Sequence, residues 1–159
     1  MKKILLLTVV AAIAFALGTP KTVQESRKVI KGDWMLDDIT YNQSGTFNVK
    51  LLDDTSKECF EGTTWRFIPN NNTGVYTVNN TDCPTGDRYF IFAIQEINQT
   101  TGLYDFLLKP TDAKGKSEEK LGFRMRLSQL NENSMQWEQT VTLEGKPFKI
   151  KMNFSKLTE

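Results

Sequence analysis

The sequence contains no histidine. Histidine is the commonest general base in enzymes and the commonest metal ligand, so its absence argues against the usual hydrolases and metal-dependent enzymes. The Gly-x-Ser-x-Gly motif of many lipases is missing as well. We therefore expect a protein that is not an enzyme and that uses no metal or cofactor. An isomerase or cyclase that works through tyrosine or a carboxylate stays open.

Neither sign of charge predominates. The chain has 20 Lys and Arg residues against 19 Asp and Glu residues. A protein this close to neutrality produces no field that attracts nucleic acid or an anionic membrane, so we expect neither as a partner. The sequence does not identify a protein partner.

Long apolar runs are confined to the N-terminus. Lys2 and Lys3 precede an almost wholly apolar stretch over residues 4–15, and Ala14-Phe15-Ala16 supplies the small residues that signal peptidase needs. This arrangement predicts a signal peptide over residues 1–18. The stretch is too short to form a stable membrane anchor.

The residues after this stretch complete the expected organisation. Positions 17–20 read Leu-Gly-Thr-Pro and offer no lipobox cysteine for lipid attachment. We expect an exported protein, periplasmic or secreted, whose mature chain has no integral membrane span. A flexible segment is expected over residues 19–27 and a single domain over residues 28–159.

Cysteine is scarce, with only Cys59 and Cys83 present. Disulfides persist in the oxidising compartments that receive exported proteins, and two cysteines allow one intramolecular pairing. The pair lacks Cys-x-x-Cys spacing and a histidine that would complete a metal site. We predict a Cys59–Cys83 disulfide.

No long amphipathic helical pattern is present, and the second half of the chain instead alternates apolar and polar residues. Successive side chains of a strand point to opposite faces, so each run directs its bulky apolar groups to one side. The polar residue Gln139 shares that side, where its amide would bond either a ligand or a neighbouring group. The expected apolar interior comprises Leu121, Phe123, Met125, Leu127, Met135, Trp137, Val141, Leu143, Phe148, Ile150, Met152 and Phe154.

Turn-forming residues separate segments of strand length. Short connections make consecutive strands antiparallel, and closing a sheet of eight removes its exposed edges. The pattern predicts an all-β fold, an antiparallel up-and-down meander closing into an eight-stranded barrel, with a two-sheet β-sandwich as the alternative. The expected strands are 33–41, 63–68, 75–78, 88–97, 103–109, 121–130, 134–143 and 147–154. Residues 46–52 are either a ninth strand or the approach to a short helix near 56–60.

The strand over residues 88–97 has apolar residues on both faces. A strand of this kind is usually buried on both sides, so we expect a helix, the N-terminal segment or a partner to cover its outer face.

A Gly-x-Trp sequence, Gly32-Asp33-Trp34, opens the first expected strand, and Thr63-Thr64-Trp65-Arg66-Phe67 follows a connection that contains a cysteine. In these features the chain resembles the lipocalin-like proteins of bacteria. The resemblance implies an eight-stranded up-and-down barrel, with Trp34 closing one end after the turn at Gly32, and an apolar cavity for a small hydrophobic molecule. In that family an arginine near the end of the last strand packs on the tryptophan, whereas the last strand here offers Lys149, Lys151 and Lys156.

Two functional hypotheses remain open. The first is an exported lipocalin-like protein that binds or carries a small hydrophobic molecule inside its barrel. The second is a non-catalytic structural or interaction module whose barrel is filled by its own side chains. An empty chamber of roughly 300 Å³ or more would favour the first. The residues expected to line the ligand site are Phe67, Tyr76, Phe123, Met125, Met135, Trp137, Gln139, Phe148, Ile150 and Met152.

Overall fold

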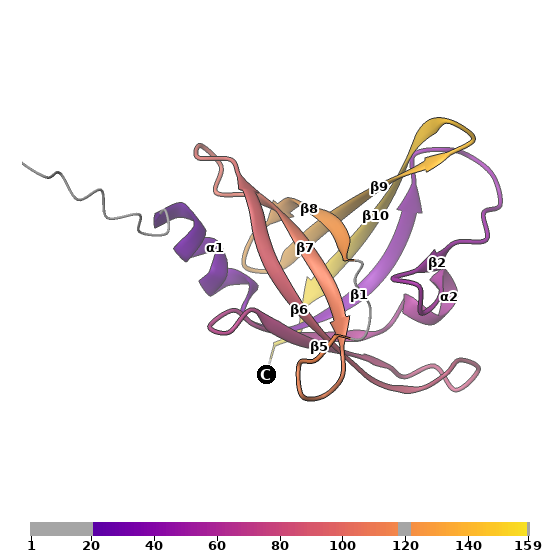
Figure 1. Cartoon of the computed structure of the whole chain (residues 1–159), viewed down its shortest axis with the longest axis horizontal. Helices are drawn as coiled ribbons and strands as arrows, with labels where there is room; N and C mark the ends of the chain where they lie inside the picture. The colour runs from indigo at the N-terminus through magenta and orange to yellow at the C-terminus, as the bar shows by residue number, and fades with distance from the viewer. Residues whose placement is uncertain (1–20, 118–121, 159) are drawn as a thin grey trace, which may run out of the picture.

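Eight antiparallel strands close into one barrel in the computed structural model, which describes residues 21–117 and 122–158 (Figure 1). Their order around the wall is β1-β10-β9-β8-β7-β6-β5-β4, so each strand lies beside its neighbour in the meander, and β1 pairs with β10 and β4. The all-β barrel is therefore confirmed, and the sandwich is wrong. The strands are β1 Gly32–Tyr41, β4 Thr64–Ile68, β5 Thr73–Val78, β6 Gly86–Ile97, β7 Tyr104–Thr111, β8 Phe123–Leu130, β9 Ser134–Leu143 and β10 Lys146–Lys156.

Four short elements accompany the barrel. The long connection from β1 to β4 contains β2 Lys50–Leu51, β3 Thr55–Ser56 and α2 Lys57–Phe60, so it holds both a small strand pair and a short helix. The fourth element, α1 Lys21–Ile30, precedes β1. The predicted signal peptide over residues 1–18 and the interior residue Leu121 lie outside the described residues.

Helix α1 corrects the expectation of a flexible segment over residues 19–27, because residues 21–27 are helical. Val23 and Ile30 are 0% and 2% exposed. They are seven residues apart, which is close to two helical turns, so they lie on one face of the helix. Burial of that face against the barrel stabilises a helix too short to form alone.

The end of the barrel next to α1 is closed around Trp34, which is fully buried. The last carbonyl groups of a helix have no partner within the helix. Here the Trp34 indole Nε1 donates to the Ile30 carbonyl at 2.8 Å, and the Lys156 Nζ donates to the Val29 carbonyl at 2.6 Å. The same Nζ lies 5.0 Å from the centroid of the Trp34 ring. The ammonium group of Lys156 therefore lies over the Trp34 ring, where the resemblance leads us to expect an arginine.

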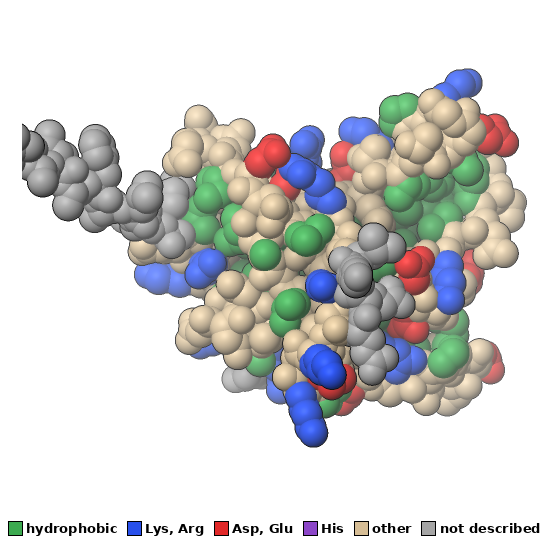
Figure 2. All heavy atoms as spheres, viewed as in Figure 1, with side chains coloured by type: hydrophobic (Ala, Val, Ile, Leu, Met, Phe, Trp, Pro, Cys, Tyr) green, Lys and Arg blue, Asp and Glu red, His purple; other side chains and the backbone are tan. Residues whose placement is uncertain are grey.

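The outer wall is charged and solvated, and charged side chains are spread over the face shown in Figure 2. Arg124 and Arg126 both pair with Asp105, at 3.0 and 3.2 Å. Lys149 pairs with Glu138 at 3.0 Å on the neighbouring strands. These are cross-strand contacts of partly exposed groups, so each contributes little to stability.

Strand β6 has no cover over its outward-facing side chains Tyr89 and Ala93, which are exposed. The expected cover is therefore wrong at these positions. A β-bulge between Ile94 and Ile97 shifts the alternation by one residue, and both isoleucines pack against the core. The change of phase explains why Ile97 packs inward, whereas Tyr89 and Ala93 precede the bulge and face outward.

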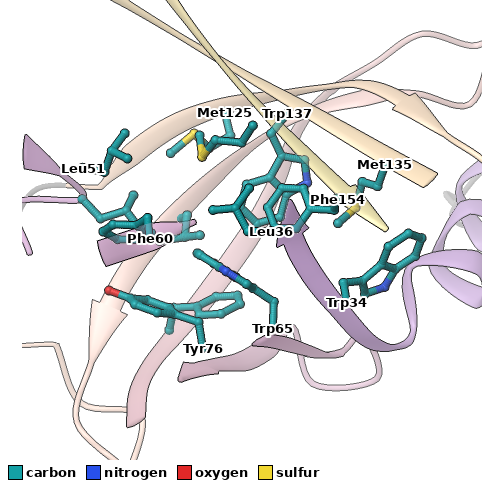
Figure 3. Packing of buried hydrophobic residues seen from close by; sticks show 14 of the residues in the cluster. Trp34, Leu36, Leu51, Phe60, Trp65, Tyr76, Met125, Met135, Trp137 and Phe154 are labelled. Carbon is teal, nitrogen blue, oxygen red and sulfur yellow. The ribbon is translucent and has the colours of Figure 1, made fainter. Parts of the chain in front are cut away.

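Aromatic rings fill the barrel interior next to the closed end (Figure 3). The Trp65 ring stacks on Tyr76 with centroids 4.4 Å apart and meets Trp137 edge-on at 5.3 Å. Trp137 in turn packs against Phe154 at 4.8 Å and Phe106 at 4.9 Å. All five side chains are at most 3% exposed, so this part of the barrel is a packed core.

Candidate functional site

The opposite end of the barrel contains a pocket of about 450 Å³, which we call the mouth pocket. It lies between the β9–β10 hairpin, the irregular segment after β1 and the start of β8. Hydrophobic side chains gather in a hollow beneath that hairpin in Figure 2. The lining residues are Thr46, Phe47, Asn48, Val49, Lys50, Leu52, Asp53, Phe123, Gln139, Val141, Thr142, Leu143, Phe148 and Ile150.

Four of the ten predicted ligand-lining residues lie in the mouth pocket: Phe123, Gln139, Phe148 and Ile150. The other six are at most 3% exposed and belong to the packed core. None of these six lines the mouth pocket, so the structure does not bring all ten residues together in it. They are Phe67, Tyr76, Met125, Met135, Trp137 and Met152.

Two predicted interior residues, Val141 and Leu143, line the pocket but remain 38% and 37% exposed. They are exposed because the two strands beside β9 pair with it over different lengths. The β9–β10 pairing continues to Leu143↔Lys146, whereas the described β8–β9 pairing stops at Arg126↔Glu138. The side chains of Val141 and Leu143 therefore still point toward the barrel interior. They lie beyond the last residue of β9 that pairs with β8, so they remain partly exposed.

Two aromatic rings form part of the pocket wall, and a third packs against them. Phe47 and Phe148 both line it, with ring centroids 4.8 Å apart, and Tyr41 packs on Phe148 at 5.1 Å. Burial raises the pKa of the Tyr41 hydroxyl, with smaller contributions from the Glu58 and Glu61 carboxylates.

Sequence reasoning did not name Phe47 as a site residue, because the segment before β2 forms no strand. The available signal was the spacing of Phe47, Val49 and Leu51, which places apolar residues at every second position. Phe47 and Val49 line the pocket, and Leu51 is buried.

Gln139 is the polar exception among the predicted lining residues that reach the pocket. Its side chain is half-buried, and its amide makes no hydrogen bond with any residue that the structure describes. The amide therefore presents both a donor and an acceptor in a largely apolar wall.

The turn between β2 and β3 separates the mouth pocket from a second pocket of about 510 Å³, because Leu52 and Asp53 line both. Both residues have positive φ values, 50° and 54°, and Asp54 N donates to Leu51 O at 2.9 Å. This is the geometry of a tight hairpin turn, which usually selects asparagine and glycine. Leucine is disfavoured there by about 1–2 kcal/mol. Burial of the Leu52 side chain, which is 5% exposed, offsets that strain.

Most of the charged groups of the second pocket, including Asp54, Arg88 and Asp112, already have partners within the protein. The Tyr76 hydroxyl donates to Asp54 at 2.8 Å, and Arg88 Nε lies 3.3 Å from the same carboxylate. Burial raises the pKa of Tyr76, and the neighbouring Asp54 carboxylate raises it further. Asp112 accepts bonds from the main-chain N–H groups of Lys114 and Lys116. We therefore interpret this pocket as a structural network beside the mouth.

The predicted disulfide is confirmed: Cys59 and Cys83 are bonded, with Cα atoms 5.8 Å apart. Cys59 belongs to α2, and Cys83 lies in the connection from β5 to β6. The bond therefore anchors the segment that carries the β2–β3 turn to the barrel wall.

The described residues contain no cluster of three or more His, Cys, Asp or Glu side chains suited to a metal ion. Within the same ranges, no helix combines the length and the apolar character needed to cross a membrane.

No family model and no curated protein matches the sequence. Among solved structures, the chain is similar to a lipocalin-like protein from Bacteroides uniformis, with a TM-score of 0.49 and 10% sequence identity. The similarity covers 81% of this chain and 99% of that chain. The lipocalin-like character of the fold rests on the barrel itself, which has eight antiparallel strands in meander order and closes between β1 and β4.

Proposed function

We propose that the protein binds a small hydrophobic molecule in the mouth pocket. The observation that carries this proposal is a cavity of about 450 Å³ with an apolar wall of Phe47, Phe148, Ile150 and Val141. Small-molecule sites usually measure roughly 300–1,000 Å³ and combine such walls with a few polar groups. The unpartnered amide of Gln139 is a polar group of this kind.

The proposed ligand lies above the aromatic core. Trp65, Trp137 and Phe154 occupy the space beneath the pocket, so the ligand contacts the upper ring of side chains and the segment after β1. This location reconciles the filled interior with a binding role. The alternative, a module with a filled barrel, would require the mouth pocket to remain empty.

Export of this binding protein is part of the proposal. The N-terminal sequence pattern supports a signal peptide, and the Cys59–Cys83 disulfide suits an oxidising compartment. We propose a non-catalytic binding protein in the periplasm or outside the cell.

The proposal is tested by fluorescence titration with the uncharged apolar probe N-phenyl-1-naphthylamine. We expect saturable binding to the unaltered protein and at least about tenfold weaker binding to Val141→Asp, which places a charge in the apolar wall. Ile68→Asp is the matched control, because Ile68 is 43% exposed and does not line the mouth pocket. Absence of saturable binding, or equal weakening in both variants, would contradict the proposal.

Native mass spectrometry of the protein purified from its own host provides a second measurement. We expect a co-purified small molecule that is lost from Val141→Asp. Consistently bare protein would favour the filled module.

A further inference from the structure

Within the described ranges, the upper part of β9 pairs with a strand on one side, that of β10. Its pairing with β10 runs from Leu143↔Lys146 to Ser134↔Ser155. Its pairing with β8 covers only the lower half and ends at Glu138↔Arg126 among the described residues. Among the residues that the structure describes, 139–143 therefore have no strand partner on the β8 side, and we call this side of the strand the β9 edge.

Hydrogen bonds at Lys149 establish which main-chain groups of β10 face β9. Lys149 N donates to Asn42 Oδ1 at 2.8 Å, and Asn42 N donates to Lys149 O at 3.2 Å. The main-chain N–H and C=O groups of Lys149 therefore point away from β9. Successive residues of a strand direct their N–H and C=O groups to opposite sides. The main-chain groups of Phe148 and Ile150 therefore point toward β9.

The opposite residues in β9 follow the same alternation. Gln139 and Val141 stand across from Ile150 and Phe148, so their main-chain groups bond to β10. Thr140 and Thr142 must then direct their N–H and C=O groups toward the β9 edge. No described residue hydrogen-bonds to these groups.

This edge lies at the rim of the mouth pocket, because Val141, Thr142 and Leu143 all line it. The sequence Gln-Thr-Val-Thr-Leu over residues 139–143 contains no charge and no proline, the usual protections of an open edge. An apolar pocket beside free main-chain groups is the arrangement by which a sheet edge binds an extended peptide-like group.

We infer that the mouth pocket takes a hydrophobic molecule that carries an amino-acid amide, such as an N-acyl amino acid. The acyl chain occupies the pocket. The amide N–H of the ligand donates to Thr142 O, and the following ligand carbonyl accepts from Thr142 N. This inference rests on the proposed function and names the class of ligand.

Two matched probes test the inference by calorimetry: N-decanoylglycine methylamide and N-decanoylsarcosine methylamide. The sarcosine compound carries a methyl group in place of the amide hydrogen and so cannot make the first bond. We expect the glycine compound to bind at least about tenfold more tightly to the unaltered protein.

The variants Thr142→Pro and Thr142→Val form a matched pair. Proline removes the main-chain N–H without breaking a β9–β10 bond, because Thr142 faces the open edge opposite Pro147. Valine keeps the N–H. We expect Thr142→Pro to bind the glycine compound at least about tenfold more weakly than Thr142→Val does, because the ligand carbonyl then has no donor at position 142. The preference for the glycine compound depends on the Thr142 carbonyl oxygen, so it should persist in both variants.

A separate reading on the unaltered protein covers the case in which Thr142→Pro fails to fold. The amide proton resonance of Thr142 should shift downfield with the glycine compound, whose carbonyl accepts from it, and should not shift downfield with N-phenyl-1-naphthylamine, which has no carbonyl. The same shift with both probes would overturn the inference.

The remaining outcomes separate this inference from the proposed function. If both compounds bind equally well to the unaltered protein, or if the two variants bind the glycine compound equally tightly, amide recognition at Thr142 is wrong and binding of an apolar molecule stands. If neither compound binds and N-phenyl-1-naphthylamine also fails to bind, the proposed function is wrong and the inference falls with it.

Discussion

Replacing Lys156 with methionine removes the ammonium group at the closed end and keeps most of the aliphatic side chain. In the native protein this ammonium donates to the Val29 carbonyl at 2.6 Å and lies 5.0 Å from the Trp34 ring centroid. A hydrogen bond from a charged donor contributes about 1.5–3 kcal/mol, and a solvent-accessible cation over an aromatic ring about 0.5–1 kcal/mol. Because Lys156 is only half-buried, the lower ends of these ranges apply.

We expect Lys156→Met to lower the free energy of unfolding by about 2 kcal/mol. Urea denaturation followed by tryptophan fluorescence measures this change, and a slope near 2 kcal/mol per M would move the midpoint by about 1 M. Lys156→Arg should retain most of the stability, because guanidinium can also donate to the carbonyl and lie over the ring.

The matched control is Lys151→Met in the same strand. Lys151 is half-buried and makes no ion pair or hydrogen bond with the described residues, so its replacement should change stability by less than about 0.5 kcal/mol. Equal losses from Lys156→Met and Lys151→Met would refute the role assigned to Lys156.

Three other perturbations have defined outcomes. Replacing Cys59 and Cys83 by serine should lower the free energy of unfolding by about 3 kcal/mol, measured with urea, because the disulfide closes a loop with a sequence separation of 24. Burial raises the pKa of Tyr104 to about 12, so between pH 10 and 12 the folded protein keeps a proton that the unfolded chain releases, and stability should fall as pH rises. Tyr104→Phe should make that decline shallower by up to about 1.4 kcal/mol per pH unit, and an unchanged slope in alkaline urea titrations would contradict this. Gly74→Ala should destabilise the barrel by about 2 kcal/mol or more in thermal melts, because the added Cβ would meet the Phe90 ring and lie 2.7 Å from a backbone carbonyl oxygen.

The strand layout could be predicted from the sequence because two local signals agree. Alternation at every second residue marks a wall with one buried face, and short polar turns force neighbouring strands to run antiparallel. The last strand illustrates the accuracy: residues 147–154 were expected, and β10 spans Lys146–Lys156. Helix α1 was missed because its stability comes from contacts of Val23 and Ile30 with the barrel, which lie outside the local sequence.

The sequence also predicted which candidate site residues point into the barrel, but it did not predict how deeply each one is buried. Alternation assigns Met135, Trp137, Gln139 and Val141 to one face of β9, and the structure agrees with that face. Their environments nevertheless range from complete burial at Trp137 to 38% exposure at Val141. The difference depends on where β8 stops pairing with β9, and pairing length is a tertiary property that no single strand encodes.

The filled core and the mouth pocket have complementary roles in one barrel. Trp65, Trp137 and Phe154 pack the lower interior, so most of the apolar stabilisation is obtained without a ligand. The upper side chains Phe148 and Val141 then add a binding surface on a wall whose lower part is held by the packed core. A site held by a folded core requires little ordering on binding, and preorganisation of this kind favours affinity. It follows that truncating Trp137 should reduce stability far more than truncating Val141, whereas a charge at Val141 should weaken ligand binding at nearly unchanged stability.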